Sequence, residues 1–416
     1  MKMRLFVFPQ PFVNTSILLV PALLLSTPNF SVAVIACLFL YSLYYCVKYS
    51  GSLYITRFDW IVIFCLTSYT LANIPNVIID GGNFRYLSGP SRFIACIPIY
   101  LMLRHLAPNP CSVIERLEVG IIIGSIGSFG IAFYQFIILN MVRVDGFIFS
   151  INFGYLSCSL LFLAFSLLSD SKHKNWLYIS MILSLFSIIS TNARGSIFSV
   201  PIILIASVVY LYHTIHLKIV ALVSLSIILG FVCLYFLSGN FKERINFTKH
   251  EFSNIASGNI EKAVSSGGRL QLWKSATEAF KASPLIGSTY SKRECIIKKL
   301  HSKGDVTSWT EGVARGHAHS QYFEMLASNG LLGVIAISLI LFAPSIYFFK
   351  KRKQVNNKIA YVGFLFVIGF IVYGLTEVPL QANLISSYYA FIVVTLVSLQ
   401  ENMVFRYREN NGKQKN

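Results

Sequence analysis

Residues 327–349 have the sequence ASNGLLGVIAISLILFAPSIYFF, in which no charged residue occurs. About 20 apolar residues in a helix cross the roughly 30 Å hydrocarbon core of a bilayer. Similar stretches recur along the 416 residues, without the alternation at every second residue that is typical of membrane β-barrels. The sequence therefore predicts an all-α polytopic membrane protein.

The composition agrees with this prediction. The chain is 55% hydrophobic and 12% charged, with a mean hydropathy of +0.63, whereas soluble chains carry about 25% charged residues. We expect about twelve transmembrane helices. The first has no small-residue cleavage site and is expected to be retained. The predicted spans are 11–27, 30–48, 58–79, 91–107, 118–140, 148–169, 175–191, 195–213, 218–238, 327–349, 359–377 and 383–400.

The distribution of the net charge of +18 predicts the orientation. If both termini are cytoplasmic, the inner loops and tails hold 18 Lys and Arg residues, and 13 more fall in the long segment 239–318. Long segments are exempt from the positive-inside rule. The bias predicts cytoplasmic termini and a long segment on the outer face of a multi-pass inner-membrane protein. The short outer loops hold only Arg85, Arg92, Arg143 and Arg194.

The basic run at 350–353 would also suit a nucleic acid. A cluster next to a span is explained more simply by topology and by anionic lipid headgroups. Membrane lipids are therefore expected partners, and nucleic acid is not.

The long segment divides the chain. It is too long for a structureless loop, so we expect folded elements in it. An apolar stripe at helical spacing predicts amphipathic helices after Gly268 and from Ser320 to Ser328, where Asn329-Gly330 supplies a stop, while 288–316 looks mobile. The predicted divisions are nine transmembrane helices in 1–238, a periplasmic loop with the catalytic motifs in 239–326, three more helices in 327–400, and a cytoplasmic tail in 401–416.

Two arginines stand in settings that suit an anion. Arg194 lies in Thr-Asn-Ala-Arg-Gly-Ser at a predicted outer turn, where a guanidinium can grip phosphate oxygens bidentately or simply reach lipid headgroups. Arg269 follows Gly267-Gly268 at the start of an expected helix. The free N–H groups and dipole of a helix N-terminus favour an anion there.

His317-Ala-His319-Ser320 precedes the tenth predicted span. Two histidines at this spacing suit a metal, but no third ligand stands at a telling distance in the sequence, so no metal and no cofactor are expected. A neutral imidazole is a good general base. The alternative is a pair of histidines on a loop surface.

His319-Ser320, nine further residues and Gly330-Leu-Leu-Gly333 resemble the signature of the O-antigen ligase family, in which His followed by Asn, Ser or Gln precedes Gly-x-x-Gly by nine residues. The motif around Arg194 and the Gly-Gly-Arg-Leu motif at Arg269 occur in the order that the family has. The His motif is typical of the wider ligase and polymerase superfamily and does not separate its members.

The resemblance implies a fold like that of C-type, metal-independent glycosyltransferases. It implies transfer of O-antigen glycan from undecaprenyl diphosphate to lipid A–core at the periplasmic face, which completes lipopolysaccharide. By this analogy Arg194 and Arg269 bind the diphosphate, and His319 is the catalytic base. The outer face has no nucleotide sugars, so a lipid diphosphate must supply the activated bond.

Further polar residues are accessory candidates. The outer-loop arginines are expected to bind phosphate or headgroups, Arg315 and His317 to tune the base, and Glu377 to position an arginine. The accessory candidates are Arg143, Arg315, His317 and Glu377, with Arg85 and Arg92 as weaker ones.

Three other functions stay open at this point. An O-antigen polymerase uses the same donor with a carrier-linked acceptor, and a protein O-oligosaccharyltransferase has a protein acceptor. A lipid-linked glycan flippase would make no bond. One long outer segment with a single His motif favours the ligase, because polymerases often have two substantial outer loops.

Overall fold

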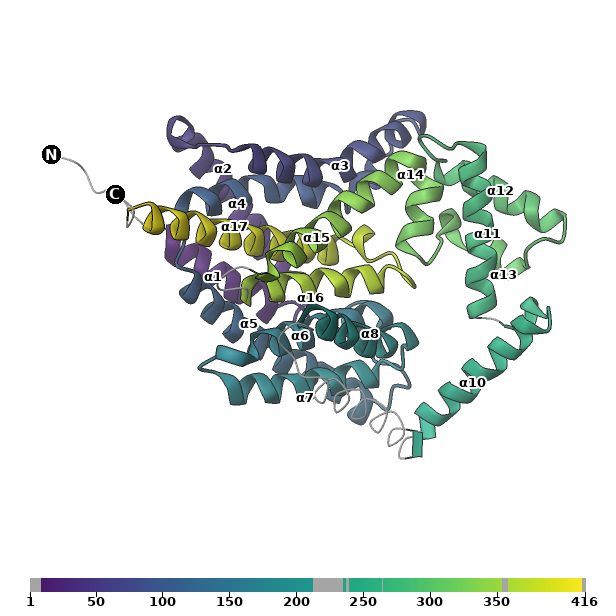
Figure 1. Cartoon of the computed structure of the whole chain (residues 1–416). Coiled ribbons are helices and arrows are strands. Elements are labelled where there is room, and N and C mark those ends of the chain that lie inside the picture. Colours follow the sequence, from purple (N-terminus) through teal and green to yellow (C-terminus); the bar gives the residue numbers. More distant parts are fainter. Residues whose placement is uncertain (1–8, 212–234, 237–238, 264, 354–357, 414–416) are drawn as a thin grey trace.

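The computed structural model describes residues 9–211, 235–236, 239–263, 265–353 and 358–413. Within these ranges every regular element is a helix and no strand occurs. Figure 1 shows most of the helices in one bundle, with a smaller group of helices at one end. The prediction of an all-α chain is confirmed for the described residues.

Eight spans in the described residues are long and apolar enough to cross a membrane. The helices α1 (Pro9–Ala22), α7 (Lys174–Ser190) and α16 (Lys358–Tyr373) are shorter. The span predicted at 218–238 lies outside the described residues, except for 235–236, so the count of twelve stays a prediction. The eight spans contain α2 (Phe30–Lys48), α3 (Arg57–Ile79), α4 (Ser91–Leu106), α5 (Pro110–Phe133), α6 (Ser150–Leu167), α8 (Arg194–Leu211), α14 (Gln321–Ile337) continuing into α15 (Ala343–Lys350), and α17 (Asn383–Lys413).

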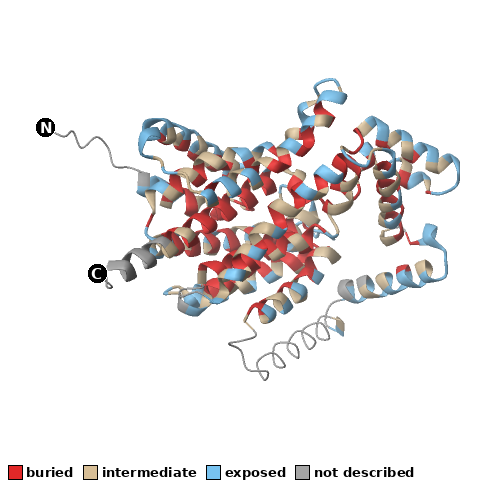
Figure 2. Cartoon of the chain, turned by 45° about the horizontal axis from the view of Figure 1, so that its top comes forward, coloured by how far each residue is buried: buried red, intermediate tan, exposed pale blue. Residues whose placement is uncertain are grey.

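Helix α17 lies at the centre of the bundle. Most of its apolar stretch is buried, and it packs on α4 and α16, while α14 packs on α3 and α6 packs on α7 and α16. Figure 2 shows the buried residues in the middle of the bundle. Large apolar side chains such as Leu40, Trp60 and Ile182 are exposed on other helices. An apolar outer surface of this kind marks contact with lipid.

Small residues bring the membrane helices close together. Between α5 and α7, Ser184 donates to the Ser125 hydroxyl at 3.1 Å, and the hydroxyls of Ser128 and Ser187 lie 3.2 Å apart. Gly124 of α5 lies against the backbone of α1, where a side chain would collide. Small side chains permit this close packing, and hydroxyl pairs stabilise it within lipid.

A buried ion pair closes the end of the bundle at which α3 begins. The Arg104 guanidinium lies 3.0 Å from the Asp59 carboxylate, which is 2% exposed. Tyr100 donates a further hydrogen bond of 2.6 Å to this carboxylate, and Thr56 forms a capping box with it at the start of α3. The charge distribution in the sequence predicts that this end of the bundle faces the cytoplasm.

The opposite end of the bundle carries the helices of the long segment (Figure 1). The helix predicted after Gly268 is confirmed as α11, which contacts α14. From this group, α10 reaches back to the start of α8, where Glu251 meets Arg194. The helices are α10 (Gly239–Ala256), α11 (Ser266–Ala282), α12 (Tyr290–Ser302) and α13 (Ser308–Glu311).

The prediction that 288–316 is mobile is wrong, because α12 and α13 lie within it. Its Lys-rich composition concealed a buried face: Arg293 and Ile297 are one helical turn apart and both are buried. The stop predicted at Gly330 is a local break only. Gly330 has φ +58° inside α14, and it touches the backbone of the turn at Pro284, where no side chain would fit. The helix then continues into the tenth predicted span.

Candidate active site

A polar cavity of about 820 Å³ lies where the bundle meets the helices of the long segment. Its wall is assembled from α3, the turn before α4, the loop between α5 and α6, α11, the segment before α14 and the loop between α16 and α17. The cavity thus collects residues from most of the chain. Its ionisable wall residues, apart from tyrosines, are Arg85, Arg143, Arg269, Arg315, His317, His319 and Glu377.

The two histidines of the sequence motif share one carboxylate. Nε2 of His317 lies 3.1 Å from Oε1 of Glu377, and Nδ1 of His319 lies 3.1 Å from Oε2. Glu377 therefore contacts both histidines, in place of the arginine that the sequence led us to expect. With Nδ1 of His319 engaged by the carboxylate, the tautomer that fits has a proton on Nδ1 and a free electron pair on Nε2.

The backbone around His319 is held in an unusual conformation. His319 has φ +46°, which is rare for a residue with a side chain. The next residues are tied to the loop after α16: the Gln321 N–H donates to the carbonyls of Gly374 and Glu377 at 2.8 and 2.9 Å. Ser320 also donates to Gly374. Such conformations persist only where the surroundings fix them, and they concentrate at functional sites.

Burial and hydrogen bonding set the charges of this group. Burial raises the pKa of Glu377, but the hydrogen bonds from His317 and His319 outweigh it and hold the pKa well below its usual range. For His317, burial lowers the pKa, whereas the hydrogen bond to Glu377 and the nearby Glu324 carboxylate raise it, with a net increase. At neutral pH Glu377 is thus an anion that orients both imidazoles.

The same three side chains have a donor set that a metal accepts. Their ligand atoms all lie within 4.8 Å of one another, and two histidines with one carboxylate can bind zinc. The sequence offered no third ligand because Glu377 is far away along the chain and close only in space. The hydrogen bonds between these side chains also satisfy them without an ion, so the absence of a metal stays a prediction.

Four arginines face the cavity: Arg85, Arg143, Arg269 and Arg315. None of them forms an ion pair with an acidic side chain in the part of the chain that the structure describes. Arg315 lies over the Tyr290 ring, 5.7 Å from its centroid. Among the wall residues Glu377 is the one carboxylate. The cavity therefore has an excess of positive charge and suits an anion with several oxygens.

Arg194 does not share this cavity. Its Nη1 lies 2.7 Å from Oε2 of Glu251 and its Nη2 donates to the Ser265 hydroxyl at 2.6 Å. Glu251 also accepts from the backbone N–H groups of Ser265 and Ser266, where α11 begins. The structure thus places Arg194 next to the N-terminus of α11, the helix that carries Arg269. Arg92 is likewise absent from the cavity wall.

Sequence reasoning missed a buried ion pair next to the histidines. Arg293 of α12 binds Glu324 of α14 bidentately, with N–O distances of 2.6 and 2.9 Å. Both side chains are 2% exposed. The feature of the sequence that could have revealed it is Glu324, a single acidic residue within the apolar stripe of Tyr322 and Met325. A charge at such a position requires a buried partner.

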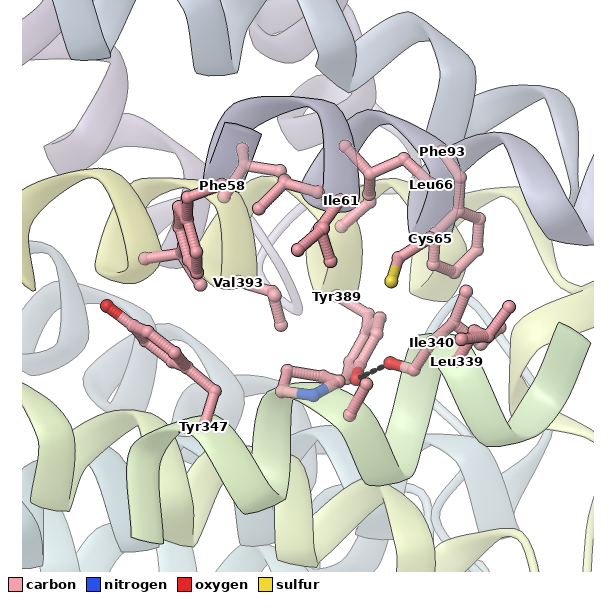
Figure 3. Close-up of a pocket in the computed structure, with 16 residues that line it drawn as sticks. Phe58, Ile61, Cys65, Leu66, Phe93, Leu339, Ile340, Tyr347, Tyr389 and Val393 are labelled. Carbon is pink, nitrogen blue, oxygen red and sulfur yellow. Dashed lines mark hydrogen bonds between the residues drawn. The ribbon is translucent and has the colours of Figure 1, made fainter. Parts of the chain in front are cut away.

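A second pocket lies within the membrane part of the bundle and is almost wholly apolar (Figure 3). Phe58, Leu66, Leu339 and Val393 are among the side chains that line it. A dashed line in Figure 3 marks the hydrogen bond that Tyr389 donates to the Ile340 carbonyl. The pocket has no carboxylate, imidazole or guanidinium in its wall, in contrast to the polar cavity.

Comparisons with known proteins support the family resemblance. The family model described as O-antigen ligase matches residues 179–338, which confirms the predicted resemblance for this segment. An uncharacterized protein of Haemophilus influenzae is 23% identical over 334 residues, which cover 77% of this chain and 82% of the relative. The matched family segment includes Arg194, Arg269 and His319, whereas Glu377 lies outside it.

Proposed function

We propose that this chain, whose residues 179–338 belong to the O-antigen ligase family, transfers O-antigen glycan from undecaprenyl diphosphate to lipid A–core. The family implies an O-antigen ligase or polymerase-like function, and its members are glycosyltransferase-like enzymes. One observation carries the proposal: a histidine oriented by a carboxylate lines the same cavity as four arginines that have no ion-pair partner among the described residues.

The reaction forms a bond between an acceptor hydroxyl oxygen and the anomeric carbon of the donor glycan. The bond from that carbon to the diphosphate oxygen breaks, and undecaprenyl diphosphate leaves. Nε2 of His319 accepts the hydroxyl proton. Glu377, 3.1 Å from Nδ1, keeps the ring in the required tautomer and stabilises the imidazolium that forms.

The arginines of the cavity neutralise the leaving group. Negative charge grows on the diphosphate as the anomeric bond breaks, and hydrogen-bond donors held in fixed positions stabilise it. Arg269 stands in the first turn of α11, where the helix dipole adds to its charge. We propose that Arg269 binds the diphosphate together with Arg143, Arg85 and Arg315.

Arg194 serves the diphosphate indirectly in this proposal. Through Glu251 and Ser265 it fixes the start of α11, and α11 carries Arg269. Because guanidinium groups supply the positive charge, we propose that transfer needs no metal ion. The proposed site faces the periplasm at the inner membrane, where lipid-linked donors and acceptors meet.

A reconstituted assay tests the proposal. Purified protein receives undecaprenyl-diphosphate O-antigen and lipid A–core, with EDTA and without nucleotide. We expect wild type to produce a ladder of lipopolysaccharide and the His319→Ala variant to produce none, although it stays folded. A wild-type reaction that stops on adding EDTA contradicts the metal-free mechanism.

Family membership alone leaves polymerisation as the second candidate. The same assay without lipid A–core separates the two functions, because a polymerase lengthens the carrier-linked glycan in the absence of lipid A–core. A protein acceptor in place of lipid A–core tests the oligosaccharyltransferase alternative. Movement of the donor across vesicles without bond formation identifies a flippase.

A further inference from the structure

We propose that the buried ion pair Arg293–Glu324 positions the two histidines for the proposed transfer reaction. The inference rests on that function for its effect on catalysis, but the positioning itself is a separate claim about the segment 316–319. The pair touches neither the donor nor the reacting atoms in this account. It acts on the backbone that carries the proposed base.

The pair holds the backbone on both sides of His317. Arg293 donates one hydrogen bond to the Gly316 carbonyl, and Oε2 of Glu324 accepts one of 2.8 Å from the Ala318 N–H. Oε2 of Glu324 also lies 3.9 Å from Nδ1 of His317. Two consecutive peptide groups are therefore fixed to a single buried pair.

The segment needs such support, because its backbone is not in a low-energy conformation. Arg315 and His319 both have positive φ angles, of 59° and 46°, which cost energy in residues with side chains. Gly316 also has positive φ, and a side chain there would press on Arg293 and Ile297. These residues would relax without contacts that hold them in place.

The pair is also joined to the cavity wall. Gln381, which lines the cavity, donates a 3.2 Å hydrogen bond to Oε1 of Glu324. Ser328, another wall residue, donates to this oxygen at 3.1 Å. A displacement of Glu324 would therefore affect the histidine segment and these two wall residues together.

Stability alone is a weak explanation for a pair this deeply buried. Removing two charges from water is costly, and replacing both partners by apolar residues of similar volume is often neutral or stabilising. Removing one partner is different, because it leaves an unpaired buried charge. Replacing both residues therefore separates an effect on the position of the histidines from an effect on folding stability. Replacing only one residue does not, because the remaining buried charge also destabilises the fold.

The experiment uses a double variant that carries both Arg293→Met and Glu324→Leu. It is compared with a matched control at the other end of the bundle. The control, Arg104→Met together with Asp59→Leu, removes another buried Arg–carboxylate pair, far from the histidine segment. Steady-state transfer kinetics, thermal unfolding and hydrogen–deuterium exchange over residues 313–321 are measured for both. Arg293→Lys is added as the conservative variant.

We expect kcat of the Arg293/Glu324 variant to fall about 100-fold, as small misplacements of catalytic groups do, with the KM for donor nearly unchanged. Exchange over 313–321 should quicken, and Arg293→Lys should recover part of kcat. The control should keep its kcat and its exchange in this segment.

Equal kcat in both double variants, or unchanged exchange over 313–321, overturns the positioning claim. A donor KM that rises while kcat is kept overturns it as well, because the pair would then serve binding. If exchange quickens but wild type transfers no glycan in any assay, the positioning stands and the proposed function fails.

Discussion

Arg269 and Arg194 have the same predicted role but different surroundings. Arg269 faces the polar cavity and has no ion pair among the described residues. Arg194 lies 2.7 Å from Glu251 with its side chain 12% exposed. A guanidinium that is already neutralised by a carboxylate has little charge left for a phosphate. A sequence motif can thus identify an arginine, but the acidic residue that pairs with its guanidinium in the fold determines whether that arginine can bind an anion.

The largest expected effect is that of replacing Glu377, the carboxylate of the polar cavity. Glu377→Gln keeps the shape of the site but removes the charge that orients His319, so we expect kcat to fall about 1,000-fold, in the way that loss of an orienting carboxylate affects other histidine bases. Transfer kinetics measure this. Glu251→Gln, on the Arg194 side, is the control, and a similar loss in both would erase the distinction between the two regions.

Lysine replacements of Arg269 and Arg194 should have the next largest effects and test the two arginines directly. Arg269→Lys should lower kcat/KM for donor about 100-fold, because an ammonium group cannot form the bidentate contact with a diphosphate. Arg194→Lys should cost far less, since an ammonium can still pair with Glu251. Donor titrations of both variants measure the effects. The reverse order would exchange the roles of the two arginines.

The ion pair at Arg194 also predicts an effect of low pH on stability. Burial raises the pKa of Glu251, but its hydrogen bonds from Arg194, Ser265 and Ser266 outweigh this and lower the pKa below its ordinary value. Its stabilising contribution is therefore present above about pH 4.3 and is lost as the pH falls further. Compared with Glu251→Gln, wild type should lose about 2–4 °C of unfolding temperature on acidification. If the unfolding temperatures of wild type and Glu251→Gln fall in parallel as the pH is lowered, this prediction is wrong.

In the polar cavity we expect a smaller loss of stability, which occurs as the pH rises and not as it falls. The pKa of His317 is raised in the folded chain, as described above, so its contribution is present below about pH 6.5 and fades as the pH rises through the folded value. Wild type should lose about 2 °C relative to His317→Gln between pH 6 and pH 9. Thermal unfolding in detergent over this range measures it, and a constant difference would count against the charged His317–Glu377 contact.

The membrane helices were predictable because apolar runs are a local property of the sequence. The helix α11 was predictable in the same way, from apolar residues at helical spacing, although Leu270 of that stripe is exposed and Leu272 and Ala276 are buried. Helix α12 was missed because its buried face includes Arg293, whose burial depends on Glu324, 31 positions away. Local composition carries no information about such a partner.

The candidate site was predictable in part. The His motif and Arg269 were found from sequence, and the structure brings them to one cavity with Arg143 and Arg315. The contact of Glu377 with both histidines joins residues 58 and 60 positions apart. The pairing of Arg194 with Glu251 spans 57 positions. Only the fold brings these partners together.

The most direct test of the central claim is equilibrium binding of undecaprenyl diphosphate, without glycan or acceptor, to wild type, Arg269→Ala and Arg194→Ala. Loss of charge-assisted hydrogen bonds should raise Kd at least about tenfold in Arg269→Ala and much less in Arg194→Ala. Equal weakening in both variants, or wild type that does not bind the lipid diphosphate, would contradict the account.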